Sequence, residues 1–157
     1  NLQTGDAPFT IALWAKPSAT RFDGCYFSYG GAASGQVISL CAESSNKMYS
    51  VHYSNDHAFT TTWTLGSWQH VILSYDPTSS TESLYVNGQL KETWTPSNLN
   101  LQSSATSYIG RASWSGTYVG ATQIDDVKLY NYPLTASQAK TLFNDGATRY
   151  GPSTGAP

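Results

Sequence analysis

Charged side chains are scarce in this chain of 157 residues: Asp, Glu, Lys and Arg make up 11% of it, where an average soluble protein has about 25%. The net charge is −2 and the 8 Lys and Arg residues form no basic run, which argues against the positive surface that a nucleic-acid-binding protein needs. No apolar stretch approaches the length of about 18 residues that spans a bilayer, so we expect no membrane insertion.

Aromatic and hydroxyl side chains take the place of charge. The 11 Tyr and 5 Trp residues together outnumber Lys and Arg, and Ser with Thr make up about a quarter of the chain. Disordered chains combine low hydrophobicity with high net charge, which is not the case here. The composition therefore predicts a folded, β-rich domain and leaves open whether its aromatic rings are core or binding surface.

The two cysteines, Cys25 and Cys41, could be free thiols, part of a metal site or a disulfide. A turn-like stretch at residues 30–35 separates them, and its centre, Ala33, lies midway between them. In an antiparallel hairpin the two would face each other within disulfide range. We therefore favour a disulfide and an oxidising compartment. Zinc is disfavoured because no second Cys pair or spaced His pair completes four ligands.

Alternating apolar and polar residues predict several short strands. The clearest runs are residues 9–15, 48–53, 68–75, 84–86 and 127–130. Asn87-Gly88 predicts a hairpin turn. Residues 134–143 have helical spacing, with Thr135 and Gln138 as a capping box and Gly146 as the expected end. The pattern predicts an all-β fold, a two-sheet antiparallel jelly-roll sandwich with one short C-terminal helix.

Several stretches occur in a characteristic order. They are FTIALWAKP at 9–17, LGSWQHV at 65–71, YD at 75–76, LYVNG at 84–88, IGR at 109–111 and IDDVKLYNYPL at 124–134. Together they resemble the opening strand, central hairpin, closing strand and terminal helix of bacterial laminin-G-like domains of the concanavalin-A-like lectin/glucanase superfamily. The resemblance covers roughly residues 5–145. It implies the jelly-roll fold but no single function, because this fold carries unrelated activities.

The N-terminus departs from that pattern. Such domains usually begin with a strand carrying a Phe-Asp-Gly-like segment, and here only Asn1 to Pro8 precede the first tryptophan strand. Either the chain starts late in its domain, as we expect, or the sandwich lacks an edge strand. We expect residues 1–150 to form one laminin-G-like domain of a longer secreted or cell-surface protein, with any signal peptide outside it. Residues 151–157, rich in Gly and Pro, are expected to be a linker to a further region.

An enzyme is the weakest hypothesis. Glucanases of this superfamily use clustered carboxylates, but Glu43, Glu82 and Glu92 have no acidic neighbour at a spacing that shares a strand face. Asp125 and Asp126 are adjacent, so a strand would point them to opposite faces. No Gly-x-Ser-x-Gly motif marks a serine nucleophile.

Asp125 is a candidate metal ligand. It shares strand parity with Val127 and Leu129, which predicts that it points toward the core, where a carboxylate needs a partner. The resemblance implies that an Asp at this position can help bind a structural Ca²⁺, and Asp6 could supply a second oxygen. The alternative is that Asp125 only accepts backbone N–H bonds at the rim.

Four ring-bearing residues lie opposite the apolar faces of their strands. They are Trp14, His52, His70 and Tyr85. If their strands share one sheet, these residues line its outer surface. The alternative is that a crossing hairpin covers and buries them.

The remaining tryptophans, Trp63, Trp94 and Trp114, lie in loop-like sequence among Thr, Ser, Pro and Gly. A tryptophan ring can stack on a sugar while hydroxyls and carboxylates bind its OH groups. Asn55 to His57 supplies acceptors for such a site. The predicted ligand-binding residues are Asp56, His57, Trp63, Trp94, Arg111, Trp114 and Tyr118. The alternative is that these tryptophans close the ends of the sandwich.

The leading hypothesis is a non-catalytic, lectin-like carbohydrate-binding module of a secreted or cell-surface protein, with a glycan or polysaccharide as partner. A structural or adhesive domain that binds protein without recognising sugar is the alternative, because a Ser/Thr-rich surface suits it equally well.

Overall fold

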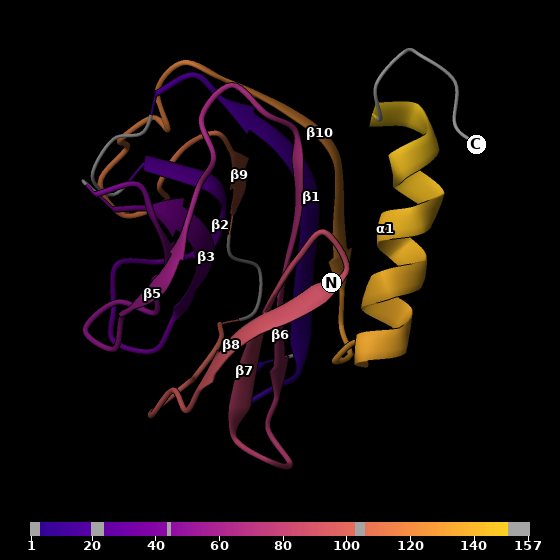
Figure 1. The fold of residues 1–157 in the computed structure, drawn as a ribbon. Helices are drawn as coiled ribbons and strands as arrows, with labels where there is room; N and C mark the ends of the chain where they lie inside the picture. Colours follow the sequence, from indigo (N-terminus) through magenta and orange to yellow (C-terminus); the bar gives the residue numbers. More distant parts are fainter. Residues whose placement is uncertain (1–3, 20–23, 44, 103–105, 151–157) are drawn as a thin grey trace.

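The computed structural model describes residues 4–19, 24–43, 45–102 and 106–150, with side chains as far as residue 145. In these residues two five-stranded antiparallel sheets pack face to face, with one helix outside them (Figure 1). This confirms the predicted sandwich. The expected linker, residues 151–157, lies outside the described residues.

The first sheet, called here the β1 sheet, has the strand order β10-β1-β6-β7-β8. Its strands are β1 (Phe9–Pro17), β6 (Gln69–Asp76), β7 (Thr81–Val86), β8 (Gln89–Trp94) and β10 (Thr122–Tyr130). The second, the β2 sheet, has the order β5-β4-β3-β2-β9. Its strands are β2 (Gly24–Gly30), β3 (Val37–Ala42), β4 (Lys47–Ser50), β5 (His57–Thr62) and β9 (Ser107–Ile109).

The core lies between the sheets because alternate residues of each strand point inward. On β1 these are Phe9, Ile11 and Leu13, which belong to one buried cluster with Ile38 and Leu40 of β3. Between β7 and β8, Asn87 and Gly88 both have positive φ, 50° and 73°, as a two-residue type I′ turn requires. The Asn-Gly signal therefore marked a real hairpin.

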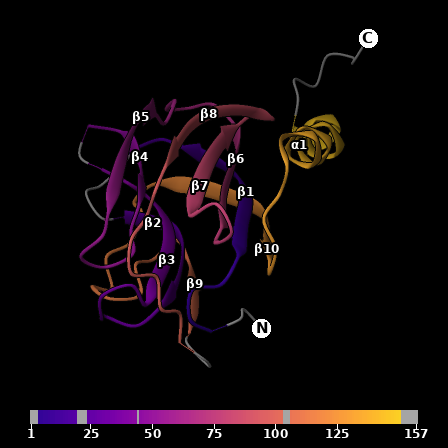
Figure 2. The ribbon, with the colours of Figure 1, turned by 90° about the horizontal axis from the view of Figure 1, so that it is seen from below.

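Helix α1 (Ala136–Tyr150) covers the outer face of the β1 sheet (Figure 2). Its capping box forms as predicted: Thr135 N–H donates to Gln138 Oε1 at 2.9 Å, and Gln138 N–H donates to Thr135 Oγ1 at 3.3 Å. The prediction that Gly146 ends the helix is wrong, because the helix continues to Tyr150.

Helix α1 determines whether the rings on the outer face of the β1 sheet are exposed or buried. Trp14, His70 and Tyr85 do share the outer face of one sheet, but all three are buried. Trp14 stacks on Phe143 of α1 with 5.8 Å between ring centroids. Burial, with a contribution from nearby Lys128, lowers the pKa of His70 to about 4. The alternative prediction, that these rings are covered and buried, is therefore correct. The element that covers them is a helix and not the hairpin that was expected.

His52 does not belong with that group. It follows β4 of the opposite sheet and points into the sandwich, fully buried, while Tyr49 and Val51 pack on the outer face of the β2 sheet. The sequence assigned the apolar face of this strand to the core. The reason for the error is that a loop covers the outer face here, so both faces of the strand are buried.

A β-bulge reverses the expected direction of Asp125. Pairing between β1 and β10 shifts register between Ala12 and Trp14, and Asp126 on the bulged side has φ of 49°. Ile124 and Val127 both pack against the core, whereas Asp125 is exposed. The prediction that Asp125 points inward is therefore wrong, because strict alternation fails at the extra residue of a bulge.

Within the described residues, no helix combines the length and apolar character needed to cross a bilayer.

Candidate functional site

The predicted disulfide is present: Cys25 and Cys41 pair across β2 and β3, with an S–S distance of 2.01 Å. The register shifts by one residue between Cys25 and Phe27. This bulge lets Tyr26 join Phe27 in the core while the disulfide stays on the outer face of the β2 sheet.

The connection between β9 and β10, residues 110–121, lies over that disulfide. Ala112 packs with both cysteines and Val51, and Trp114 closes the cluster from one side. The connection turns back on itself: Ala112 N–H donates to Thr117 O at 2.8 Å, and Arg111 bridges to Tyr118 as in an antiparallel pair. We call residues 110–121 the Arg111 loop.

Arg111 lies between two tyrosines. Its guanidinium carbon lies 5.0 Å from the ring centroid of Tyr108 on β9 and 5.8 Å from that of Tyr118 in the loop. Both distances are in the range of a cation–π contact. The ring of Tyr118 is 63% exposed. The loop thus presents a cation and an accessible aromatic ring together.

A polar cavity of about 390 Å³ has Tyr108 in its lining. Tyr108 and Ser113 line it on one side, and the turn between β2 and β3 lines it on the other. The remaining lining residues are Gly30, Gly31, Gln36, Gln102 and Thr106.

One lining group has no partner. Ser113 Oγ is shielded from solvent and makes no hydrogen bond within the described part of the protein. A buried hydroxyl without a partner is costly, so it marks a place where a ligand or water would complete the structure. Amides, hydroxyls and an unsatisfied Ser113 give this cavity the chemistry to bind a polar molecule with several OH groups.

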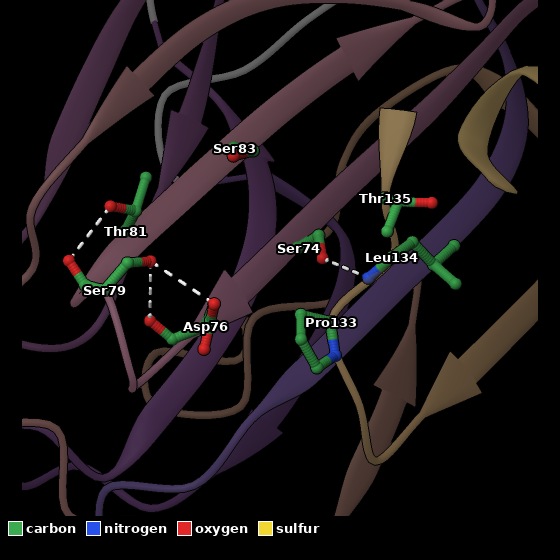
Figure 3. Close-up of a pocket in the computed structure, with 8 residues that line it drawn as sticks. All are labelled: Ser74, Asp76, Ser79, Thr81, Ser83, Pro133, Leu134 and Thr135. Carbon is green, nitrogen blue, oxygen red and sulfur yellow. Dashed lines mark hydrogen bonds between the residues drawn. The ribbon is translucent and has the colours of Figure 1, made fainter. Parts of the chain in front are cut away.

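A second cavity, about 270 Å³, lies on the β1 sheet beside the segment that leads to α1 (Figure 3). Two of its polar side chains already accept hydrogen bonds from the backbone. Asp76 accepts from Thr78 N–H at 2.9 Å, and Ser74 Oγ accepts from Leu134 N–H at 2.8 Å. We therefore give it less weight as a ligand site than the cavity beside Arg111.

The seven predicted ligand residues lie at three separate locations in the structure. Arg111, Trp114 and Tyr118 share the Arg111 loop. Trp63 is 3% exposed; its ring lies 4.0 Å from that of Tyr26 and its indole N–H donates to Cys41 O. Trp63 is therefore a core residue.

Asp56, His57 and Trp94 form the third place, where one edge of each sheet meets the other. The rings of His57 and Trp94 stack with centroids 4.7 Å apart and an interplanar angle of 10°. Asp56 Oδ1 accepts from His52 N–H at 2.9 Å, and the indole N–H of Trp94 donates to buried Glu82. These contacts join edge strand β5 of the β2 sheet to edge strand β8 of the β1 sheet.

The two candidate metal ligands are not neighbours. Tyr75 O–H donates to Asp6 at 2.7 Å, and Tyr75 pairs with Phe9, whereas Asp125 pairs with Trp14. Phe9 and Trp14 are five residue steps apart along β1, which corresponds to about 16 Å. Asp125 accepts from the adjacent Asp126 N–H at 2.6 Å. Among the described side chains, no three of His, Cys, Asp and Glu gather as a metal site.

The sequence did not single out the cavity residues Gln36, Gln102, Thr106, Tyr108 and Ser113. The available signal was the glycine-rich turn at 30–35, which was used only to pair the cysteines. What could not be seen was that the Arg111 loop folds back over that hairpin.

The two packed antiparallel sheets and the C-terminal helix are those of a concanavalin-A-like sandwich. The chain matches the profile of the Laminin_G_3 family, described as the concanavalin A-like lectin/glucanases superfamily, over residues 1–140. It belongs to this family. No curated protein matches it in sequence.

Solved structures share the fold at low identity. Domain 4 of AbnA, an extracellular GH43 arabinanase from Geobacillus stearothermophilus in complex with arabinotriose, is 23% identical with a TM-score of 0.69, over 90% of this chain and 68% of that one. The CBM40 of a Ruminococcus gnavus IT-sialidase, bound to α2,3-sialyllactose, is 15% identical with a TM-score of 0.68, over 87% and 83%. A Trypanosoma rangeli sialidase mutant with trans-sialidase activity is 18% identical with a TM-score of 0.66, over 94% of this chain but only 24% of that one.

Proposed function

We propose that this domain is a non-catalytic carbohydrate-binding module whose site is the cavity beside Arg111. The observation that carries the proposal is the unpartnered, shielded hydroxyl of Ser113 in a polar cavity lined by Tyr108. Tyr108 lies against Arg111, which in turn lies against the exposed ring of Tyr118. Hydroxyl and amide groups suit the OH groups of a sugar, and a tyrosine ring suits its C–H face. Similar folds that carry arabinotriose and sialyllactose support the same class of ligand.

Two of the three glutamates, Glu82 and Glu92, are poorly placed to act as the acid of a glycosidase, which supports a role without catalysis. Glu82 is fully buried against His52, so no substrate reaches it. Burial would raise the pKa of Glu92, but hydrogen bonds from Thr61 and Thr60 outweigh it and lower that pKa to about 2. An ionised carboxylate held in this way is no proton donor, which a glycosidase requires.

The disulfide and the proposed ligand both favour a secreted or cell-surface protein. Structural Ca²⁺ stays a prediction, with Asp6 and Asp125 as separate candidates. A thermal melt that is unchanged by a chelator and by added Ca²⁺ would count against it.

The test is a glycan array followed by affinity electrophoresis in soluble polysaccharides. We expect binding by the wild-type domain and at least tenfold weaker binding after Tyr118→Ala or Ser113→Ala. Tyr132→Ala is the matched control, because Tyr132 is another exposed tyrosine, at 44%, on the connection before α1. Retention on no glycan would refute the proposal and leave the adhesive alternative. Loss of binding with Tyr132→Ala alone would place the site elsewhere.

A further inference from the structure

We propose that the cavity beside Arg111, together with the guanidinium of Arg111, recognises an acidic sugar rather than a neutral one. We call this cavity and Arg111 the Arg111 site, and by an acidic sugar we mean one that carries a carboxylate. This inference rests on the proposed function and specifies its ligand. It comes from three features of the site: its charge, the free donors of Arg111 and the fixed position of that side chain.

The site carries a single charge. The residues that line the cavity are uncharged, and they come from residues 24–42 and 99–124. Within these two stretches of sequence Arg111, which lies against Tyr108 of the lining, is the one charged residue. The protein as a whole has net charge −2. A cation beside an uncharged cavity attracts an anionic ligand more strongly than a neutral one.

Among the residues that the structure describes, the guanidinium of Arg111 forms no ion pair. The ion pairs in the described residues are His52 with Glu82 and Lys128 with Asp126. Arg111 Nε is shielded and makes no hydrogen bond there. Arginine stays charged at all physiological pH values and presents its N–H groups as a planar fork that matches a carboxylate.

The side chain of Arg111 is also held in place. Besides the rings of Tyr108 and Tyr118, it lies against Gly116, where a Cβ would come within 3.0 Å of Nη2. A cation fixed by its neighbours loses little side-chain entropy when it binds. We infer that a sugar carboxylate pairs with Arg111 at the edge of the cavity, while Ser113 Oγ and the cavity amides take ring hydroxyls.

The experiment compares acids with their uncharged esters. Oligosaccharides of galacturonic, glucuronic and sialic acid are titrated into the domain by calorimetry beside the same oligosaccharides as methyl esters. The ester removes the charge and keeps the sugar. A charge-assisted pair differs from a neutral one by about ten- to hundredfold in affinity, so we expect at least one acid to bind that much more tightly than its ester. The preference should shrink as NaCl rises.

The variants assign the preference to Arg111. Arg111→Gln should bind acid and ester equally, and Arg111→Lys should keep part of the preference because it retains charge but not the fork. Lys91→Gln, which removes an exposed cation on β8, is the control and should leave the preference intact. Thermal melts of all variants verify that they are folded.

The outcomes separate this inference from the function on which it rests. Equal binding of acids and esters, with loss on Tyr118→Ala, would overturn the acidic ligand and keep the carbohydrate-binding module. A sulfated galactan that binds more tightly than every carboxylated sugar would also overturn it. Binding of no sugar of either kind would refute the proposed function itself.

Discussion

Glu82 and His52 form a buried charged pair that joins the two sheets, and Glu82→Gln tests what the pair contributes. Both side chains are 0% exposed, with His52 Nε2 3.2 Å from Glu82 Oε1. His52 Nδ1 also lies 2.9 Å from Val37 O, so both ring nitrogens face acceptors, as in the protonated ring. Ser50 Oγ and the indole of Trp94 donate to the same carboxylate.

Removing one partner of a buried pair leaves the other without compensation and costs about 3–5 kcal/mol. For a domain of this size, each kcal/mol shifts the Tm by about 2–4 °C. Ser50 and Trp94 donate to different oxygens of Glu82, so Glu82→Gln keeps the size of the side chain but only one of these two acceptors. The loss therefore reports the charge together with one hydrogen bond, and not a change of volume. We expect the Tm to fall by roughly 6–20 °C.

The pH dependence of the stability should have opposite signs in the wild type and in Glu82→Gln. Burial alone would lower the pKa of His52, but Glu82, by its charge and hydrogen bond, outweighs burial and raises it above 6.5. The stability from the pair is therefore full below pH 6.5 and is lost as the pH rises through the raised pKa. In Glu82→Gln burial is the largest remaining influence, against the weaker effects of Val37 and Asp56, so we expect the pKa of His52 to fall below its unfolded value. That variant should instead lose stability as the pH falls below about 6.5.

The assay is urea unfolding followed by tryptophan fluorescence between pH 5 and 8. Glu43→Gln is the control, because that carboxylate accepts a bond from the exposed Ser45 rather than a buried cation. A Glu82→Gln variant that loses less than about 1 kcal/mol would contradict the reasoning, since that is the scale of a surface pair. The same direction of pH dependence in both proteins would contradict it as well.

Three further predictions concern local structure. Replacing Cys25 and Cys41 together by Ala should destabilise the domain by about 3 kcal/mol, because the bridge closes a loop of 16 residues, and a reducing agent should lower the Tm of the wild type only. Gly30→Ala should strongly destabilise the domain and perturb the cavity, since the φ of Gly30 is 116° and a Cβ there would lie 1.9 Å from a backbone oxygen. Gly31→Ala is the control and should change the thermal melt little, because a Cβ at Gly31 would meet no atom within 4 Å. Thr135→Ala should cost about 1 kcal/mol in urea unfolding through the lost cap, and an unchanged midpoint would show that the capping box is not stabilising.

Local signals predicted the fold well where neighbours along the chain set the geometry. The Asn87-Gly88 turn, the capping box at Thr135 and the opposed cysteines each depend on residues within one hairpin or one helical turn. Alternation predicted the inward set of β1 for the same reason. The bulge at Asp126 broke the alternation of β10, and no local pattern marked it.

The candidate site was predicted in part. Arg111, Trp114 and Tyr118 lie within eight residues of each other, so the sequence could group them as one loop. Trp63 and Trp94 have the same Thr-rich surroundings as Trp114, yet one is core and the other joins the sheets. Sequence context cannot separate these cases, because burial depends on which distant strand covers the ring.

The sequence by itself determined the sandwich, the hairpins, the helix cap and the disulfide, since periodicity and turn chemistry act over a few residues. It also determined that one cation stands among the neutral residues of 24–42 and 99–124. Only the tertiary structure decided that α1 covers the outer rings of the β1 sheet, that His52 meets Glu82, and that the Arg111 loop lies over the disulfide hairpin. Those contacts join residues far apart in the chain, and the free energy of burying their surfaces is a property of the packed sheets, not of any segment alone.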